Sequence, residues 1–245
     1  MQKKAVNKPN LWRELIWENI LEQTDFVEKQ NVVLTVEHAF KVGRFLGWYY
    51  GQEHKARVVI GKDTRRSSYM FEDALSAGLT ASGADVYLLH VTTTPSVSYV
   101  TRTEDFDCGI MISASHNIFY DNGIKVINAK GHKLEAEIEE KIESYIDGTW
   151  GEIPYATRDA IGRTVDYSAG RNRYIGHLIA MATRSFKDKR VGLDCSNGSA
   201  SSIAKSVFDA LGAKTYVINS EPDGTNINRN CGSTHVHVLQ EFVKE

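Results

Sequence analysis

A polar loop between two short apolar runs carries the residues of this sequence that are best suited to chemistry. Residues 110–112 are Ile-Met-Ile, Ser113, Ser115, His116 and Asn117 follow them, and an apolar run returns at 124–127. Short apolar runs bounded by polar residues predict buried strands. A loop pinned between two strands can turn its polar groups toward a substrate, because sheet hydrogen bonds do not consume them. This serine loop is therefore the first candidate site.

Ser115 is open to more than one interpretation. A lone loop serine is most often a turn residue that hydrogen bonds the nearby backbone, and this alternative stays open. An acyl-transfer role is not supported, because the sequence around Ser115 is not a G-x-S-x-G elbow. His116 is its direct neighbour, and neighbours in an extended loop point to opposite sides, so His116 is not an obvious general base for it. His116 could instead bind a substrate or donate to a phosphate.

A serine that carries a phosphoryl group would need cations or backbone donors around it, because the phosphate brings about −1.5 to −2 charges at pH 7. Lys125 and the cluster of Lys62, Arg65 and Arg66 would supply part of that field if their loops converge at one sheet edge. The alternative for each is a solvated surface cation, which we favour for Arg66. Residues 121–123, Asp-Asn-Gly, have the composition of a tight turn that shapes the loop.

The elements that must position these residues follow a β-α-β order. We expect a helix from Val36 after an N-cap at Thr35, a strand over 56–60, a polar loop over 61–68, a helix ending at Gly83 and a strand over 85–89. A short helix to about residue 102 then precedes the strand that feeds the serine loop, and another helix follows the turn at 130–131. This order predicts an α/β fold with functional loops at the carboxyl ends of the strands.

A second α/β pattern follows a Gly- and Pro-containing stretch at residues 147–154, the best candidate for a domain boundary. It predicts a strand over 190–194, a small-residue turn, a helix over about 200–211, a strand over 215–218 and a last helix near the end. The turn at 196–199 could cradle an anion with backbone N–H groups, although a structural turn is at least as good an explanation. A weakly specified amphipathic helix is expected around residues 12–21.

The fold class predicted is α/β, with two α/β/α layered domains, mixed sheets and an incomplete second domain. We divide the chain into an atypical segment over residues 1–30, a first domain over 31–148 and a second over 149–245.

Composition bounds the partners and the compartment. The chain has 245 residues, 42% of them hydrophobic, and a formal net charge of −2. This charge gives no reason to expect nucleic acid or an anionic membrane surface as a partner. The three cysteines, Cys108, Cys195 and Cys231, are widely spaced without a C-x-x-C pair, which favours buried free thiols. No signal-peptide core or membrane-length run is present, so we expect a soluble, cytoplasmic protein without a membrane partner.

Several stretches together resemble one known family. Residues 112–117 (I-S-A-S-H-N), followed by 120–125 (Y-D-N-G-I-K), are similar to the phosphoserine loop of the α-D-phosphohexomutases, and most of all of the bacterial phosphoglucosamine mutases. Residues 61–65, 194–198, 221–228 and 230–235 support the resemblance, which runs from about Val33 to the end. The last stretch favours phosphoglucosamine mutase over its phosphomannomutase and phosphoglucomutase relatives, which remain the alternative.

The resemblance implies a function in amino-sugar and cell-wall precursor synthesis. Ser115 would be the phosphorylated residue, giving its phosphoryl group to glucosamine 6-phosphate and taking one back from a bisphosphate intermediate to leave glucosamine 1-phosphate. His116 and Lys125 would be its catalytic partners, and Arg65 and Asn117 would bind substrate or phosphate. The implied cofactor is Mg²⁺, bound through the Ser115 phosphate. The implied partners are the phosphosugar, a bisphosphate primer and a second copy in a homodimer.

Three departures from the family pattern set a limit on this expectation. Residues 1–30 contain nothing like the G-T-D-G-x-R-G segment, the D-x-D-x-D-R metal loop is absent, and Ile118 stands where the family usually has proline. The remaining metal ligands are therefore missing from this sequence. We expect the chain alone to be inactive in turnover. The alternative of another class is a truncated, catalytically silent chain that at most binds a partner or a phosphosugar.

Overall fold

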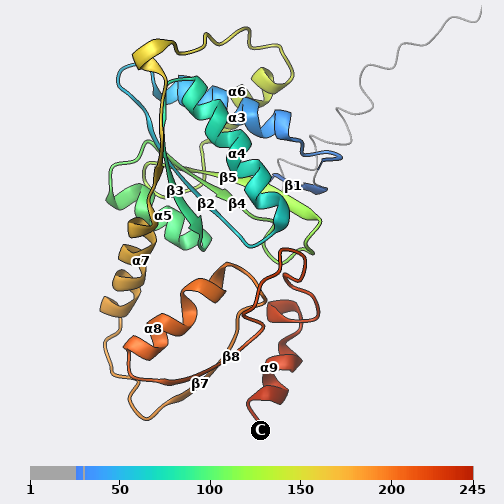
Figure 1. Cartoon of the computed structure of the whole chain (residues 1–245), viewed down its shortest axis with the longest axis vertical. Helices are drawn as coiled ribbons and strands as arrows, with labels where there is room; N and C mark the ends of the chain where they lie inside the picture. The colour runs from blue at the N-terminus through green and yellow to red at the C-terminus, as the bar shows by residue number, and fades with distance from the viewer. Residues whose placement is uncertain (1–25, 30, 245) are drawn as a thin grey trace, which may run out of the picture.

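A computed structural model of the chain describes residues 26–29 and 31–244 (Figure 1). The helix expected around residues 12–21 lies outside the described residues. The same holds for the whole segment 1–30 except residues 26–29. The described chain is α/β, as predicted, and it is built on two sheets, one of six strands and one of two.

The larger sheet is mixed, with the strand order β1-β5-β4-β2-β3-β6. Its strands are β1 (Phe26–Lys29), β2 (Arg57–Lys62), β3 (Asp85–Val91), β4 (Cys108–Ile112), β5 (Asp121–Asn128) and β6 (Thr164–Asp166). The strands β4, β2, β3 and β6 run parallel to one another, whereas β5 is antiparallel to both β4 and β1. The central strands β2 and β4 are buried almost throughout, as expected for parallel strands covered on both faces.

Helices cover both faces of this sheet (Figure 1). On one face lie α3 (Val36–Tyr50), α4 (Arg66–Ala81) and α6 (Ala136–Ile146), and on the other lies α5 (Thr94–Thr103). The helix α3 begins where the sequence predicts, because the Thr35 hydroxyl accepts the His38 N–H and the His38 ring accepts the Thr35 N–H.

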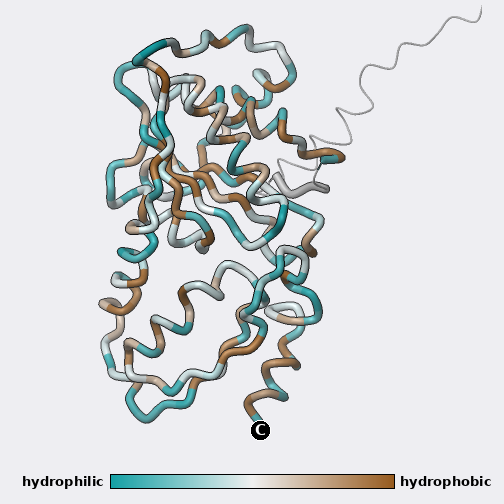
Figure 2. The backbone as a smooth tube through the Cα atoms, viewed as in Figure 1, coloured by the Kyte–Doolittle hydropathy of each residue, from teal (hydrophilic) through white to brown (hydrophobic). Residues whose placement is uncertain are grey.

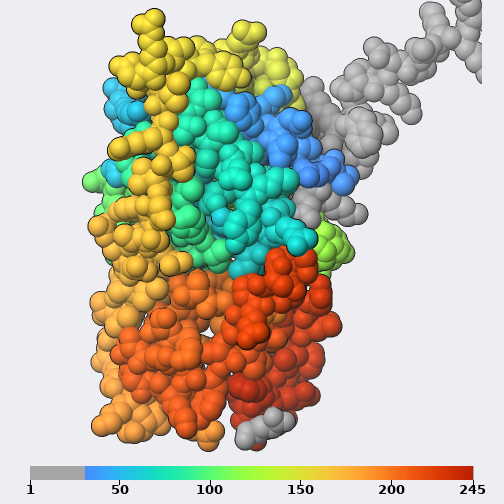
Figure 3. Space-filling view, in the orientation of Figure 1, coloured from blue at the N-terminus to red at the C-terminus, as the bar shows by residue number. Residues whose placement is uncertain are grey.

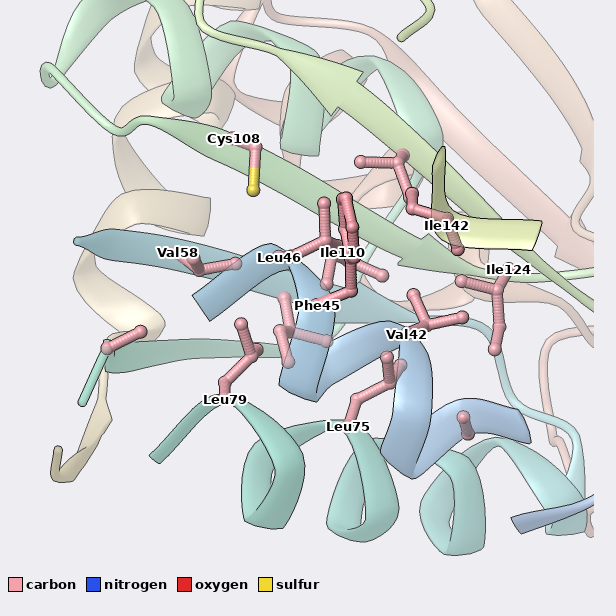
Figure 4. Packing of buried hydrophobic residues seen from close by; sticks show 14 of the residues in the cluster. Val42, Phe45, Leu46, Val58, Leu75, Leu79, Cys108, Ile110, Ile124 and Ile142 are labelled. Carbon is pink, nitrogen blue, oxygen red and sulfur yellow. The ribbon is translucent and has the colours of Figure 1, made fainter. Parts of the chain in front are cut away.

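Alternate residues of the strands feed two apolar clusters. Val58 and Ile60 join the cluster under α3 and α4, and Val59, between them, joins the cluster under α5. Figure 4 shows Phe45 and Leu46 of α3 and the leucines of α4 facing the strands of the first cluster. In Figure 2 the strands of the larger sheet form a hydrophobic centre inside a more polar outer layer.

The chain then passes through α7 (Ser168–Ala180) to a smaller part, which we call the two-stranded unit, residues 186–244. Its strands β7 (Arg190–Asp194) and β8 (Lys214–Ile218) are parallel, and its helices are α8 (Ala204–Ala210) and α9 (Val236–Phe242). The rest of the described chain, residues 26–29 and 31–185, is the six-stranded unit. In Figure 3 the two units are in contact, with red residues of the loop after β8 against the cyan start of α4.

Three expected local structures are corrected. The helix α4 begins at Arg66 rather than after a polar loop ending at residue 68, so Ser67 and Ser68 are buried in its first turn. Residues 121–123 are the start of β5 and pair with β1, and are not a tight turn. The helix expected over 200–211 is interrupted, because a 3₁₀ segment over Ser199–Ser202 precedes α8.

The domain boundary at residue 148 stays a prediction. The strand β6 lies beyond it and pairs with β3 in the larger sheet. Among the described residues, no helix combines the length and the apolar character that crossing a membrane would require.

Candidate functional site

Three loops meet at the edge of the larger sheet where the parallel strands β2, β3 and β4 end. The N–H of Asp63 donates to the carbonyl of Ile112 at 2.9 Å, and the N–H of Thr92 donates to the carbonyl of Lys62 at 3.0 Å. Each loop is therefore tied to its neighbour as it leaves the sheet. The loop after β2, which carries Arg65 and Arg66, and the serine loop after β4 therefore lie at one edge of the sheet.

A pocket of about 280 Å³ opens between these loops and the two-stranded unit. Its lining from the six-stranded unit comes from the ends of β2, β3 and β4, and its lining from the other unit comes from the turn after β7 and the loop after β8. The residues are Asp63, Thr93, Thr94, Pro95, Met111, Ser113, Ser115, His116, Cys195, Ser196, Gly198, Ser199, Ala200, Ile227, Asn228 and Ser233. We call it the serine pocket.

Ser115 is exposed to solvent and lines the serine pocket. Its φ of 52° lies in the left-handed region, which costs a residue with a Cβ about 1 kcal/mol or more. Its N–H donates to the Ser113 hydroxyl at 3.1 Å. The exposed neighbour His116 also lines the pocket. The structure thus brings together two of the predicted catalytic residues.

Arg65 lies beneath the serine loop, fully buried. Its Nη2 donates to the carbonyls of Ser115 at 3.2 Å and Asn117 at 2.9 Å, and its Nε forms an ion pair with Asp63 at 3.1 Å. Burial lowers the pKa of the guanidinium, while the nearby carboxylates of Asp63 and Asp121 raise it. Phosphate binding by Arg65 stays a prediction, since its observed partners are two loop carbonyls and the Asp63 carboxylate.

A buried polar network supports Arg65 in turn. The Asp63 carboxylate accepts the Ser68 hydroxyl at 2.7 Å, and the Ser68 hydroxyl accepts the Asn122 amide at 3.0 Å. The same amide donates to the Ser67 hydroxyl at 2.8 Å. Asn122 is fully buried, which explains why the sequence Asp-Asn-Gly belongs here to a strand rather than to a turn.

The other predicted cations lie in different settings. Lys62 is buried in an ion pair with Glu72 and does not line the serine pocket. Arg66 is exposed, as favoured from the sequence, and its backbone N–H donates to Gly224. Lys125 is partly buried on β5, opposite Met111 of β4. Lys62 and Arg66 do not line the serine pocket, and a contribution of these cations to the field around a phosphate on Ser115 stays a prediction.

Asn117 contributes to the loop through both its carbonyl and its side chain. The amide donates to the Asp121 carboxylate at 3.1 Å, which closes the loop on itself.

The turn after β7 also has a structural role, because the carbonyl of Asn197 accepts the Thr64 hydroxyl at 2.6 Å. A 3₁₀ segment over Ser199–Ser202 separates this turn from α8, and α8 itself has 7 residues, too few to make a strong anion site at its start.

The sequence argument missed Asn228. Its amide donates to the carbonyl of Ser115 at 2.9 Å and to that of Asn117 at 2.8 Å, the same two oxygens that Arg65 binds. The stretch around it was noted only as part of a family pattern. A signal was present, since asparagines alternate at 226, 228 and 230, and Asn is the residue with a side chain that most readily takes a positive φ.

The residues that the structure describes contain no group of three or more His, Cys, Asp or Glu side chains close enough to hold a metal ion. The three cysteines are free and buried, as predicted. Burial, with a smaller contribution from the Asp194 carboxylate, raises the pKa of the Cys195 and Cys231 thiols. Neither thiol is therefore set up as a nucleophile.

Comparisons with known proteins agree with this geometry. Residues 22–150 match the family model described as phosphoglucomutase/phosphomannomutase, alpha/beta/alpha domain I. A phosphoglucosamine mutase from Lachnospira eligens is 72% identical over 222 residues, which are 89% of this chain and 49% of that protein. A phosphoglucosamine mutase from Lachnoclostridium phytofermentans is 73% identical over 220 residues, 90% of this chain and 49% of that protein.

A solved structure extends the likeness to the fold of both units. A phosphoglucomutase/phosphomannomutase family protein from Burkholderia thailandensis matches 94% of this chain and 50% of its own with a TM-score of 0.77 and 22% identity. The chain spans about half the length of the curated relatives it matches.

Proposed function

This chain belongs to the phosphoglucomutase/phosphomannomutase family, whose domain I model matches residues 22–150 of its 245, and from that premise we propose that Ser115 is the phosphoryl carrier of a phosphoglucosamine mutase. The observation that carries the proposal is the exposed Ser115 hydroxyl on a doubly anchored loop at the mouth of a pocket. The reaction is the interconversion of glucosamine 6-phosphate and glucosamine 1-phosphate.

The transfer has two halves that balance. In the first, the C1 hydroxyl oxygen of glucosamine 6-phosphate bonds to phosphorus and loses its proton, while the bond from phosphorus to the Ser115 oxygen breaks and that oxygen gains a proton. In the second, the bisphosphate presents its other end, the Ser115 hydroxyl oxygen bonds to the phosphorus on C6 and loses its proton, and the C6 oxygen leaves phosphorus and gains a proton. Positioning and charge stabilisation supply most of the catalysis in such transfers.

His116 and Lys125 are proposed as the residues that stabilise charge during this exchange. His116 lines the pocket beside Ser115, so its ring can donate to a phosphoryl oxygen. For Lys125 the proposal rests on its place in the family motif. Asn117 and Arg65 are proposed as substrate- or phosphate-binding residues on the same ground, and their observed contacts support a role in shaping the loop.

We also propose Mg²⁺ as the cofactor, bound through the Ser115 phosphate. The described residues do not fit a complete site, since they offer no cluster of three ligating side chains. No step is therefore assigned to the metal. For the same reason we expect this chain to accept a phosphoryl group without turning over glucosamine 6-phosphate. The proposed setting is cytoplasmic, and the proposed partners are the phosphosugar, a bisphosphate primer and a second copy of the chain in a homodimer.

The test is phosphorylation of Ser115. The chain is incubated with Mg²⁺ and glucosamine 1,6-bisphosphate, and peptide mass spectrometry locates any phosphoryl group. We expect one on Ser115, none on Ser115→Ala, and an unchanged result for Ser144→Ala, a serine of α6 outside the pocket. A phosphoryl group on a different serine, or none at all, would overturn the assignment.

A second assay separates turnover from carrier chemistry. Production of glucosamine 1-phosphate from glucosamine 6-phosphate is measured with a trace of bisphosphate, and we expect none above background. Turnover that disappears in Ser115→Ala would show that the isolated chain is a working mutase. Comparison of glucosamine, glucose and mannose bisphosphates as donors tests the alternative phosphomannomutase and phosphoglucomutase activities.

A further inference from the structure

The two units are joined by a line of hydrogen bonds beside the serine pocket. The Thr64 hydroxyl donates to the carbonyl of Asn197 at 2.6 Å, and the Arg66 N–H donates to the carbonyl of Gly224 at 3.0 Å. The Asn228 amide donates to the serine loop. All three residues of the two-stranded unit have a positive φ, 48° for Asn197, 89° for Gly224 and 57° for Asn228. The contacts of the two-stranded unit with the loops after β2 and β4 are thus made by Asn and Gly, the residues that best tolerate the left-handed region.

The serine loop accepts hydrogen bonds from both units. The carbonyls of Ser115 and Asn117 each accept one bond from Arg65 and one from Asn228. A carbonyl oxygen has two lone pairs, so both oxygens are fully used. Arg65 is fixed by the core of the six-stranded unit, whereas Asn228 arrives with the two-stranded unit.

We propose that Asn228 is a positioning residue for Ser115, an inference that rests on the proposed carrier role of that serine. The amide of Asn228 stabilises the left-handed backbone of Ser115 by holding the carbonyls on either side of His116. The direction of the Ser115 hydroxyl then depends on the docking of the two-stranded unit. An error of about 1 Å in such a group can cost roughly 100-fold in rate.

Substitutions at Asn228 can remove the amide without forcing the backbone. Asn228→Gly accepts the φ of 57° and loses both hydrogen bonds, and Asn228→Asp keeps the shape but replaces the N–H donors by an acceptor. The matched controls are Asn230→Gly and Asn230→Asp, two residues away, where φ is 51° and the side chain is exposed. If one variant at 228 fails to fold, the other still tests the proposal.

The first measurement is hydrogen exchange of the segment 113–120, which does not depend on any phosphoryl transfer. We expect exchange about tenfold faster in both Asn228 variants and unchanged in both Asn230 controls, because two hydrogen bonds of the loop are lost. The second is the rate of Ser115 phosphorylation against glucosamine 1,6-bisphosphate concentration. We expect the maximum rate to fall by about 10- to 100-fold and the half-saturating concentration to stay within about twofold.

The outcomes separate this inference from the function proposed above. Exchange in the Asn228 variants equal to that of the unaltered chain overturns the inference. So does an unchanged maximum rate with a shifted half-saturating concentration, which would make Asn228 a ligand-binding residue. If the unaltered chain is never phosphorylated, the carrier role fails, and faster exchange in the Asn228 variants alone still supports Asn228 as the residue that holds the loop.

Discussion

The two units of this chain differ in how deeply their strands are buried. In the six-stranded unit every residue of β4 is buried, whereas in the two-stranded unit both strands begin exposed and are only partly buried after that. Parallel strands are normally covered on both faces, and a pair of strands alone is marginal in water. We therefore expect the six-stranded unit to hold its own shape and the two-stranded unit to be stabilised by its contacts with the other.

This difference places the candidate site at an instructive position. The serine loop belongs to the six-stranded unit, where it rests on buried strands and on the fully buried Arg65. Its second anchor, Asn228, comes from the less covered side. The position of the serine loop therefore depends on how the two-stranded unit docks on the six-stranded unit.

The largest expected contrast is in the cores. Phe71 of α4 is fully buried, and Phe71→Ala should cost about 3–5 kcal/mol of unfolding free energy because a large cavity remains. Val207 of α8 is 8% exposed and belongs to neither of the two apolar clusters described above, and Val207→Ala should cost roughly 1 kcal/mol. Denaturant titration followed by circular dichroism measures both. Equal losses would show that the two units are equally well packed.

Ion pairs give the second contrast. Lys62 and Glu72 are buried, and the Lys62 ammonium also lies 3.9 Å from the centre of the Tyr69 ring. Glu72→Gln should cost about 3–5 kcal/mol, since it leaves a buried charge without its partner. The pair of Lys205 and Asp209 on α8 is exposed, so Asp209→Asn should leave the titration midpoint unchanged.

A double substitution sharpens the argument about the buried pair. Lys62→Met with Glu72→Leu removes both charges and should recover most of the stability lost in Glu72→Gln. A double variant as unstable as the single one would mean that the loss in Glu72→Gln comes from losing the ion pair itself and not from leaving the Lys62 charge buried without a partner.

Much of the fold could be predicted because local signals agreed with the final packing. The Thr35 cap, the apolar stripe of α3 and the strand over Arg190–Asp194 each carried enough information within a few residues. The errors arose where distant contacts overrode composition. Residues 121–123 look like a turn, but the pairing of β5 with β1 and the buried hydrogen bonds of Asn122 make them a strand.

The candidate site shows the same division. Ser115 and His116 could be identified because loop, strand and motif coincide in one stretch of sequence. The contacts of Arg65 could not, because a charged residue next to other charges gives no sign that it will be fully buried under a loop 50 residues away. Asn228 is 113 residues from Ser115, and only the docking of two units brings them together.

Glycines on helices provide a third comparison, with effects of opposite sign. A Cβ on Gly78 of α4 would lie 2.2 Å from the carbonyl oxygen of Phe40 in α3, so Gly78→Ala should cost roughly 1–3 kcal/mol. Gly176 of α7, the helix that leads to the two-stranded unit, has no atom within 4 Å of such a Cβ. Gly176→Ala should stabilise the chain by about 0.5–1 kcal/mol through helix propensity. Thermal unfolding reports both, and stabilisation by Gly78→Ala would contradict the close helix contact.

The smallest effect concerns pH and the edge where β6 joins the sheet. Burial alone would raise the pKa of Asp85, but hydrogen bonds from the Arg163 backbone and side chain, together with Lys55, hold the pKa below its usual value. A carboxyl whose pKa is depressed in the folded state contributes stability that is present above its unfolded pKa, about 3.9, and is lost as pH falls through the folded value. At pH 7, Asp85→Asn should therefore cost about 1 kcal/mol, because the hydrogen bonds and the ion pairs weaken.

The sign can be checked by comparing stabilities across the acid range. The difference between the unaltered chain and Asp85→Asn should shrink as pH falls below about 4, because the protonated carboxyl has lost the same charge. Asp73→Asn, on the exposed face of α4, is the matched control and should leave the unfolding free energy at pH 7 unchanged. A gap for Asp85→Asn that stays constant down to low pH would mean that the charge of the Asp85 carboxylate is not the source of the lost stability. The hydrogen bonds that Asp85 accepts from Arg163 would then hold β6 beside β3 equally well with a neutral carboxyl.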